Sequence, residues 1–213
     1  LEDAARLTAR ELNTLTQRGG GEPPVELPPT RIQLYKDILT RCYLLMQSDP
    51  NVPDVSHIHT FARPHLHEVM VILRPDAPFQ DEWKGGRATT SDLYVNQIMG
   101  KYRLKVKDFR EKPSGAQAMI YAEQAVNTPA LAFVLGNVEG GKLAEPNSMF
   151  GDGNDIRWVS GGKQGMAMEF SIGAGDCPSG CIHRKYWTYH VDSEGKITYQ
   201  GTRGEIPDEM DGE

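Results

Sequence analysis

The sequence predicts an α+β protein, and three features carry that prediction. Between residues 69 and 147, segments with the 3.6-residue apolar period of helices alternate with short β-branched strands. Their order is strand, helix, strand, strand, helix, strand, which is typical of the ferredoxin-like arrangement. Residues 156–200 then show strand-like alternation and no helical period. We therefore expect a ferredoxin-like βαββαβ block with a β-rich C-terminal extension.

Size and composition narrow the class of protein. The chain has 213 residues, enough for one large domain with its own core. Its net charge of −6 disfavours nonspecific nucleic-acid binding, which needs a basic surface. No apolar run approaches the ~20 residues of a membrane helix. No signal peptide is visible, and the start at Leu1 rather than Met indicates a mature or trimmed form.

Residues 1–54 are expected to form a helical extension that contains a flexible linker. An apolar face predicts a first helix over residues 1–18, and the Gly/Pro-rich "RGGGEPPVELPP" follows it. Thr30 is expected to cap a second helix in a capping box with Gln33. The apolar stripe of that helix comprises Ile32, Tyr35, Leu39, Cys42 and Met46.

The central block begins with "VMVILRP", a β-branched strand, and continues with a helix in "TSDLYVNQIMGKY". The next helix is expected to have Thr128 as its cap and Pro129 as its first residue, where no N–H donor is needed. Short apolar or alternating runs predict the remaining strands at 104–109, 118–124 and 142–147.

The C-terminal part is expected to be wholly β. The strands "IRWV", "MAMEFSI", "YWTYHV" and "KITYQ" form a meander that either extends the first sheet or packs beside it. An α+β domain over 55–204 would then comprise the ferredoxin-like 69–147 and the β-rich 148–204. The acidic tail 205–213 is expected to be disordered.

The central block resembles the propeptides of subtilisin-like proteases and their stand-alone inhibitor relatives. The resemblance rests on "VMVILRP" and on the closing "GGKLAEPN". In that family the sheet face packs on the protease, and the segment after the last strand occupies the active-site cleft. It therefore implies a serine-protease partner and the contact residues Glu145, Asn147 and Phe150. The chain departs from the family because β-rich sequence, not a catalytic domain, follows. It also lacks a Gly-Thr-Ser nucleophile motif, so it is not itself such an enzyme.

A second resemblance covers "GAGDCPSGCIHRKYWTYHVDSEGKI", residues 173–197. This stretch is similar to the C-terminal part of uncharacterised exported bacterial proteins that carry Gly-Asp-Cys-Pro-x-Gly-Cys before an aromatic strand. The "WKGG" at Trp83–Gly86 and the "AEPN" belong to the same pattern. The resemblance implies an extracellular or periplasmic location and names no activity.

Three cysteines, Cys42, Cys177 and Cys181, leave at least one thiol unpaired within the chain. Cys42 lies on the helical stripe and is expected to be a buried small hydrophobe. Cys177 and Cys181 enclose a proline and a glycine, so a tight turn can close a short disulfide loop that adds local rigidity. Redox-active thiols, or a zinc site that recruits His183 and His190, are the alternatives.

The segment "HIHTFARPHLHE" contains two His-x-His pairs, His57 with His59 and His65 with His67. On extended backbone, residues two apart share a face, so each pair can present two imidazoles. Together, with Glu68 as a carboxylate ligand, they are candidates for a zinc or copper site. The alternatives are surface histidines that precede a strand and a pH-sensitive patch.

Two further features each allow a functional interpretation and a purely structural one. The oxygens of Asp152, Asn154 and Asp155 in "FGDGNDIRW" could bind calcium, but no glutamate closes a twelve-residue loop, so a polar turn fits better. In the strand "YWTYHV", one face is expected to be core, and the other could be an exposed binding face, with Trp187 as the candidate partner contact.

These features favour an exported, non-enzymatic binding protein, in its most concrete form a protease-inhibitor-like or propeptide-like module. The alternatives are a metal-dependent enzyme or metal-binding protein that uses the four histidines, and a structural surface or adhesion domain. No residue pattern assigns catalysis, so the sequence leaves enzymatic activity open. Zinc or copper is the candidate cofactor.

Overall fold

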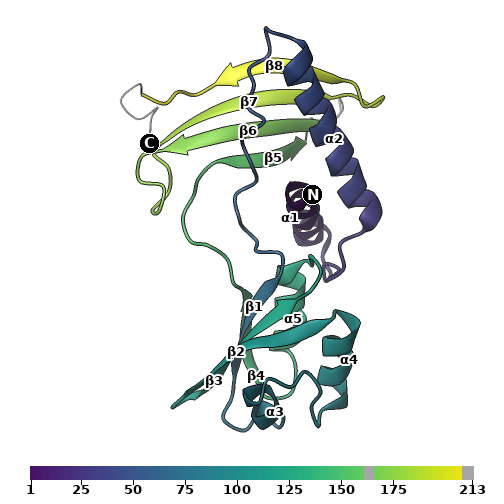
Figure 1. The fold of residues 1–213 in the computed structure, drawn as a ribbon, viewed down its shortest axis with the longest axis vertical. Helices are drawn as coiled ribbons and strands as arrows, with labels where there is room; N and C mark the ends of the chain where they lie inside the picture. Colours follow the sequence, from purple (N-terminus) through teal and green to yellow (C-terminus); the bar gives the residue numbers. More distant parts are fainter. Residues whose placement is uncertain (161–165, 208–213) are drawn as a thin grey trace. The chain divides into compact units, whose positions relative to one another are not determined.

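The computed structural model describes residues 1–160 and 166–207 (Figure 1). Within them the chain forms two antiparallel four-stranded sheets and a few helices, which confirms the α+β class. The chain divides into two compact units. Unit 1 combines residues 1–11, residues 28–63 and those from 150 onward, and unit 2 combines residues 12–27 and 64–149.

Unit 2 contains the first sheet and the helices between its strands. In chain order its elements are β1 (Glu68–Leu73), α3 (Gln80–Lys84), α4 (Leu93–Lys101), β2 (Leu104–Lys112), β3 (Gly115–Ala122), α5 (Thr128–Gly136) and β4 (Gly141–Pro146). The strand order is β2-β3-β1-β4, and each neighbouring pair is antiparallel. Only the short α3 was not expected from the sequence.

One face of this sheet makes the core of unit 2. The side chains of Val69, Val71 and Leu73 in β1 are fully buried, whereas Met70 and Ile72 between them are half-buried. This alternation follows from the two-residue period of a strand. The buried side chains of α3, α4 and α5 join the same core, so the helices cover that one face (Figure 1).

Unit 1 contains the second sheet, which is separate from the first. Its strands are β5 (Asp155–Ser160), β6 (Met166–Ala174), β7 (His183–Val191) and β8 (Ile197–Arg203), in the order β5-β6-β7-β8. Two helices precede them in the chain, α1 (Glu2–Gly19) and α2 (Pro29–Ser48). The strands therefore form the expected meander without extending the first sheet.

Residues 2–11 of α1 and all of α2 belong to unit 1 and contribute to its core, whereas residues 12–19 of α1 belong to unit 2. Leu7 of α1 and Tyr35 and Cys42 of α2 are buried in one cluster with Phe170 of β6 and Tyr189 of β7. The apolar face of a sheet must be covered, and the stripe along α2 covers this one. The division expected from the sequence, with an extension over 1–54 and a domain over 55–204, thus differs from the two units of the structure.

The second helix begins differently from the capping-box prediction, which is wrong. Pro28 occupies the N-cap position without a side-chain hydrogen bond, and Pro29 is the first helical residue. Thr30 therefore lies inside the first turn. The Gln33 amide donates to the Asp37 carboxylate at 2.7 Å instead of returning to the cap. Proline at the first position satisfies the helix start because it has no N–H to cap.

The start of α5 is also shifted by one residue from the prediction. Asn127 is the N-cap and Thr128 is the first helical residue. The Thr128 hydroxyl donates to the His65 carbonyl and so ties the helix to the segment before β1. Of the tail expected to be disordered, 205–213, residues 208–213 lie outside the described part of the chain.

The described residues contain no helix with the length and apolar character needed to cross a membrane.

The assignment of α1 to the core predicts a large effect of Leu7→Ala. Leu7 is 1 % exposed, so the substitution should lower the free energy of unfolding by about 3 kcal/mol through lost burial and a cavity. Leu15 in the same helix is 48 % exposed, and Leu15→Ala should change it by less than about 0.5 kcal/mol. Urea unfolding followed by circular dichroism measures both. If Leu7→Ala lowers the free energy of unfolding as little as Leu15→Ala does, α1 is a peripheral extension and not part of the core.

Candidate functional site

The face of the first sheet that points away from the helices carries an apolar stripe. Met70 lies opposite Met119 of β3, and Ile72 lies opposite Leu143 of β4. Leu143 is exposed, and the other three are half-buried. We define the open face by the side chains that share this orientation: Glu68, Met70, Ile72, Gln117, Met119, Tyr121, Leu143 and Glu145. The predicted contact residue Glu145 is exposed on it, opposite Met70.

A carboxylate at the start of β1 fixes one end of the open face. Lys107 of β2 forms an ion pair with Glu68 Oε1, and the Asn147 amide donates to Glu68 Oε2 at 2.6 Å. The hydrogen bond from Lys107 is the main cause that lowers the pKa of Glu68, and the Asn147 bond adds to it against the opposing effect of burial. The backbone N–H of Asn147 also donates to the Glu68 carbonyl at 3.0 Å. The predicted contact residue Asn147 is therefore held to β1 by two hydrogen bonds.

The chain beyond Asn147 becomes exposed within three residues. Ser148 Oγ still accepts a hydrogen bond from the His65 N–H at 3.3 Å. Met149 is then 60 % exposed and Phe150 is 95 % exposed, the highest value among the exposed large hydrophobic residues of the described chain. The structure thus places the predicted contact Phe150 directly after an anchored strand end.

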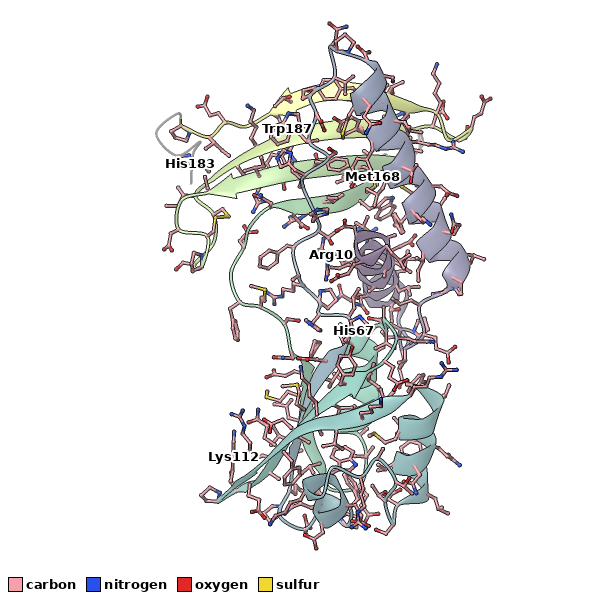
Figure 2. The ribbon with its side chains drawn as sticks, in the orientation of Figure 1. Arg10, His67, Lys112, Met168, His183 and Trp187 are labelled. Carbon is pink, nitrogen blue, oxygen red and sulfur yellow. A yellow bond between two sulfur atoms is a disulfide. The ribbon has the colours of Figure 1, made fainter. Side chains whose placement is uncertain are left out.

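The two cysteines of the segment 173–197 are joined. Cys177 and Cys181 form a disulfide in the loop between β6 and β7, with their Cα atoms 4.0 Å apart (Figure 2). This pairing agrees with the stapled turn expected from their spacing. Cys42 is a free thiol in the core of unit 1, and burial raises its pKa to about 12. It is therefore a packing residue, as its place on the α2 stripe predicted.

The four histidines fall into different units. His57 and His59 belong to unit 1, where His59 Nδ1 lies 2.9 Å from Asp3 Oδ2. His65 and His67 belong to unit 2, with ring centroids 6.2 Å apart, and His67 Nδ1 lies 2.9 Å from the Ala122 carbonyl. Among the residues at 1–160 and 166–207, no three His, Cys, Asp or Glu side chains gather to hold a metal ion. The zinc or copper site stays a prediction.

The oxygens considered for calcium have protein partners. Asp152 Oδ1 lies 2.6 Å from Arg184 Nη2, and Asp155 Oδ1 lies 2.9 Å from Arg10 Nη1. The side-chain oxygen of Asn154 accepts the N–H of Gly173 at 3.2 Å. Guanidinium groups and a backbone donor thus occupy the positions that a cation would use, which fits the polar-turn interpretation.

Trp187 is not on a binding surface. Only 7 % of it is exposed, and it packs in the core of unit 1 together with Tyr189. The strand alternation instead turns Tyr186 outward, where the Arg203 guanidinium carbon lies 3.7 Å from its ring centroid. Arg203 also pairs with Glu169 at 2.9 Å. The proposed Trp187 contact is corrected, because the larger aromatic ring of this strand faces the core.

Sequence reasoning missed the pairing of Lys107 with Glu68. A β-bulge between Val106 and Asp108 interrupts the alternation of β2 and brings the Lys107 side chain to the open face. The one signal in the sequence is a glutamate at the head of an otherwise apolar strand, "EVMVIL". A charge in that position needs a partner when the strand becomes the centre of a sheet.

In comparisons with known proteins, no family model, no curated protein and no solved structure matches this chain. Function is therefore inferred from the open face, from the segment after β4 and from the sequence resemblances.

The Glu68 contacts predict a pH-dependent stability. A carboxyl whose pKa is lowered by folding contributes stability above its unfolded pKa, about 4.3, and loses it as the pH falls through the lowered folded pKa. Glu68→Gln should therefore lower the free energy of unfolding at pH 7 by on the order of 1 kcal/mol. That deficit should shrink below pH ~4. Glu145→Gln, an exposed change on the same face, is the control. A deficit for Glu68→Gln that is constant from pH 7 to pH 3 would refute the assignment.

Proposed function

We propose that the protein is an exported, non-enzymatic binding protein that inhibits a subtilisin-like serine protease, with unit 2 as a ferredoxin-like, propeptide-like module. Two features of unit 2 support the fold assignment. Its element order is β1-α4-β2-β3-α5-β4 once the short α3 is set aside, and its strand order is β2-β3-β1-β4. Its helices cover one face of the sheet, as they do in the family that the central block resembles.

One observation carries the functional proposal. The open face leads directly into a chain segment that presents Phe150 to solvent. A partner that covers Phe150 would gain about 2 kcal/mol from its burial. A standard protein interface buries about 800 Å² on each side, more than a short segment offers. The proposal therefore assigns both the open face and the segment from Glu145 to Gly151 to the contact.

The proposed mechanism is substrate-like occupation of the protease cleft. Main-chain pairing between an extended segment and the cleft supplies affinity. The hydrogen bonds between Asn147 and Glu68 hold the strand end before binding, so less conformational entropy is lost in the complex. Phe150 would then fill the specificity pocket, which favours proteases that accept a large apolar residue. Export is supported by the disulfide, because such bonds persist in oxidising compartments.

An inhibition titration against subtilisin, chymotrypsin and trypsin tests the proposal, with the integrity of the chain followed by mass spectrometry. We expect stoichiometric, reversible inhibition of subtilisin by the intact chain. Trypsin should be inhibited least, because its pocket selects a basic side chain. If none of the three enzymes is inhibited, or if the chain is degraded before inhibition develops, the proposed function is wrong.

Substitutions separate the two parts of the contact. Phe150→Ala should raise the inhibition constant at least about tenfold, as expected for a central apolar contact. Met119→Lys in the middle of the open face should also raise the inhibition constant, and it leaves the segment from Glu145 to Gly151 unchanged. Phe133→Ala is the matched control, because Phe133 is 52 % exposed on α5, on the helix side of the sheet. An equal loss in the Phe133 variant would mean that the effects are not local to the proposed contact.

A further inference from the structure

The disulfide loop, residues 175–182 between β6 and β7, packs against the backbone that follows Phe150. The N–H of Asp152 donates to the Cys177 carbonyl at 2.8 Å. Gly151 has a φ of +98°, and a Cβ at this position would lie 3.0 Å from the Cys177 oxygen and 3.2 Å from the Pro178 Cα. A side chain here would strain the backbone at this φ and crowd the Cys177 oxygen, so glycine is strongly favoured. The disulfide loop and residues 151–152 are therefore in direct backbone contact within unit 1.

Arg184 holds the same backbone from the other side. Its Nη2 lies 2.6 Å from Asp152 Oδ1, and its Nη1 donates to the Gly153 carbonyl and to Ser171 Oγ, both at 2.9 Å. Arg184 is itself a residue of β7, and its side chain is only 11 % exposed. The three residues after Phe150 are thus fixed to the hairpin of β6 and β7 through backbone atoms as well as through one ion pair.

The disulfide determines where the Cys177 carbonyl points. The Cys177 oxygen also accepts the N–H of Gly180 at 3.3 Å, which closes the turn inside the disulfide. Cys181 lies against Gly173 of β6, where a Cβ would come within 2.3 Å of its sulfur. The residues around it, Asp176, Pro178 and Ser179, are exposed and bury little apolar surface. The turn is held by the covalent bond together with backbone hydrogen bonds, from the N–H of Cys177 to the Gly175 carbonyl and from the N–H of Ser179 to the Asp176 carbonyl.

We propose that the Cys177–Cys181 disulfide is a clamp that decides whether the Phe150–Gly151 bond is a protease-resistant contact or a cleavage site. With the disulfide intact, residues 151–153 are fixed, and a protease cannot separate the two sides of the bond. Reduction releases the Cys177 carbonyl from its place against Gly151, so that only the Arg184 contacts with Asp152 and Gly153 still hold the segment, and it opens more often. The consequence for inhibition rests on the proposed function: a reduced chain changes from inhibitor to substrate.

The chemical step is thiol–disulfide exchange with a dithiol. The dithiol attacks one sulfur of the pair, its second thiol resolves the mixed disulfide, and the dithiol is oxidised to a cyclic disulfide. Two electrons and two protons are transferred, and Cys177 and Cys181 become thiols. Both cysteines are partly exposed in an exposed turn, so a small dithiol can reach them. Cys42 is buried and takes no part.

The test measures cleavage after Phe150 by chymotrypsin, whose pocket accepts large aromatic residues, with fragments identified by mass spectrometry. Proteolysis of a folded chain reports local opening. Treatment with dithiothreitol should accelerate cleavage at Phe150–Gly151 at least about fivefold, because the Asp152 hydrogen bond no longer has a fixed acceptor. Alkylation by iodoacetamide confirms that both thiols have formed.

Three variants make the test specific. The double substitution Cys177→Ser and Cys181→Ser should be cleaved fast with or without dithiothreitol. Gly151→Ala should also be cleaved fast although its disulfide is intact, because its Cβ would crowd the Cys177 oxygen and strain the backbone at a positive φ. Ser179→Ala, an exposed change inside the turn, should behave like the original chain. Circular dichroism of each variant shows that faster cleavage is local and not caused by unfolding.

The outcomes separate the clamp from the proposed function. Equal cleavage rates before and after reduction, or slow cleavage of Gly151→Ala, would overturn the clamp. Inhibition of subtilisin measured on the same samples addresses the other proposal. An oxidised chain that resists cleavage but inhibits no protease would disprove the inhibitor function and leave the clamp standing. A reduced chain that remains an intact inhibitor would disprove the clamp and leave the inhibitor function standing.

Discussion

The antiparallel pairing of β1 with β3 on one side and β4 on the other is the constraint on which unit 2 depends. Because β1 is central, its alternation decides which face of the whole sheet is buried. A shift of one residue would move Val69 and Val71 out of the core and Met70 into it. The pairing also carries Glu68 to the edge of the open face, where a charge is tolerated only with Lys107 and Asn147 as partners. The segment that leaves β4 is positioned by the same strand that defines the core.

The regular elements of both sheets could be predicted from the sequence because their period is a local property. Strands such as "VMVILRP" and "MAMEFSI" and the apolar stripe of α2 are visible without knowledge of their neighbours. Helix caps were predicted less well. The N-cap of α2 is Pro28, two residues before Thr30, and the fixed φ of Pro29 starts that helix. The N-cap of α5 is Asn127, one residue before Thr128.

The hydrophobic period of a segment predicts whether it is a helix or a strand, but not which other element it packs against. The stripe of α2 predicted a helix, but nothing in it indicated that the helix covers a sheet formed more than 100 residues later. The same limit applies to the sites. Two cysteines four residues apart, with a proline and a glycine between them, favour a bond to each other, because a tight turn can bring them within disulfide distance. The pairing of Glu68 with Lys107 depends on a bulge in β2, and the contact of Asp152 with Cys177 depends on how two distant loops meet. The glutamate at the head of "EVMVIL" indicates that a partner is needed but not which one, and the Asp152–Cys177 contact leaves no pattern in the sequence.

A covalent bond in the turn after β6 has a physical reason. A turn made of Asp176, Pro178, Ser179 and Gly180 buries almost no apolar surface, so the hydrophobic effect cannot hold it in one conformation. Closing a loop this short also removes little entropy from the unfolded chain, so the bond adds little to global stability. Its effect is local: it fixes the position of one carbonyl, and that carbonyl is the acceptor for the backbone beside the most exposed phenylalanine of the described chain. The Cys177–Cys181 bond thus contributes little to global stability but orders the backbone next to Phe150. Its role is therefore best explained by what Phe150 contacts.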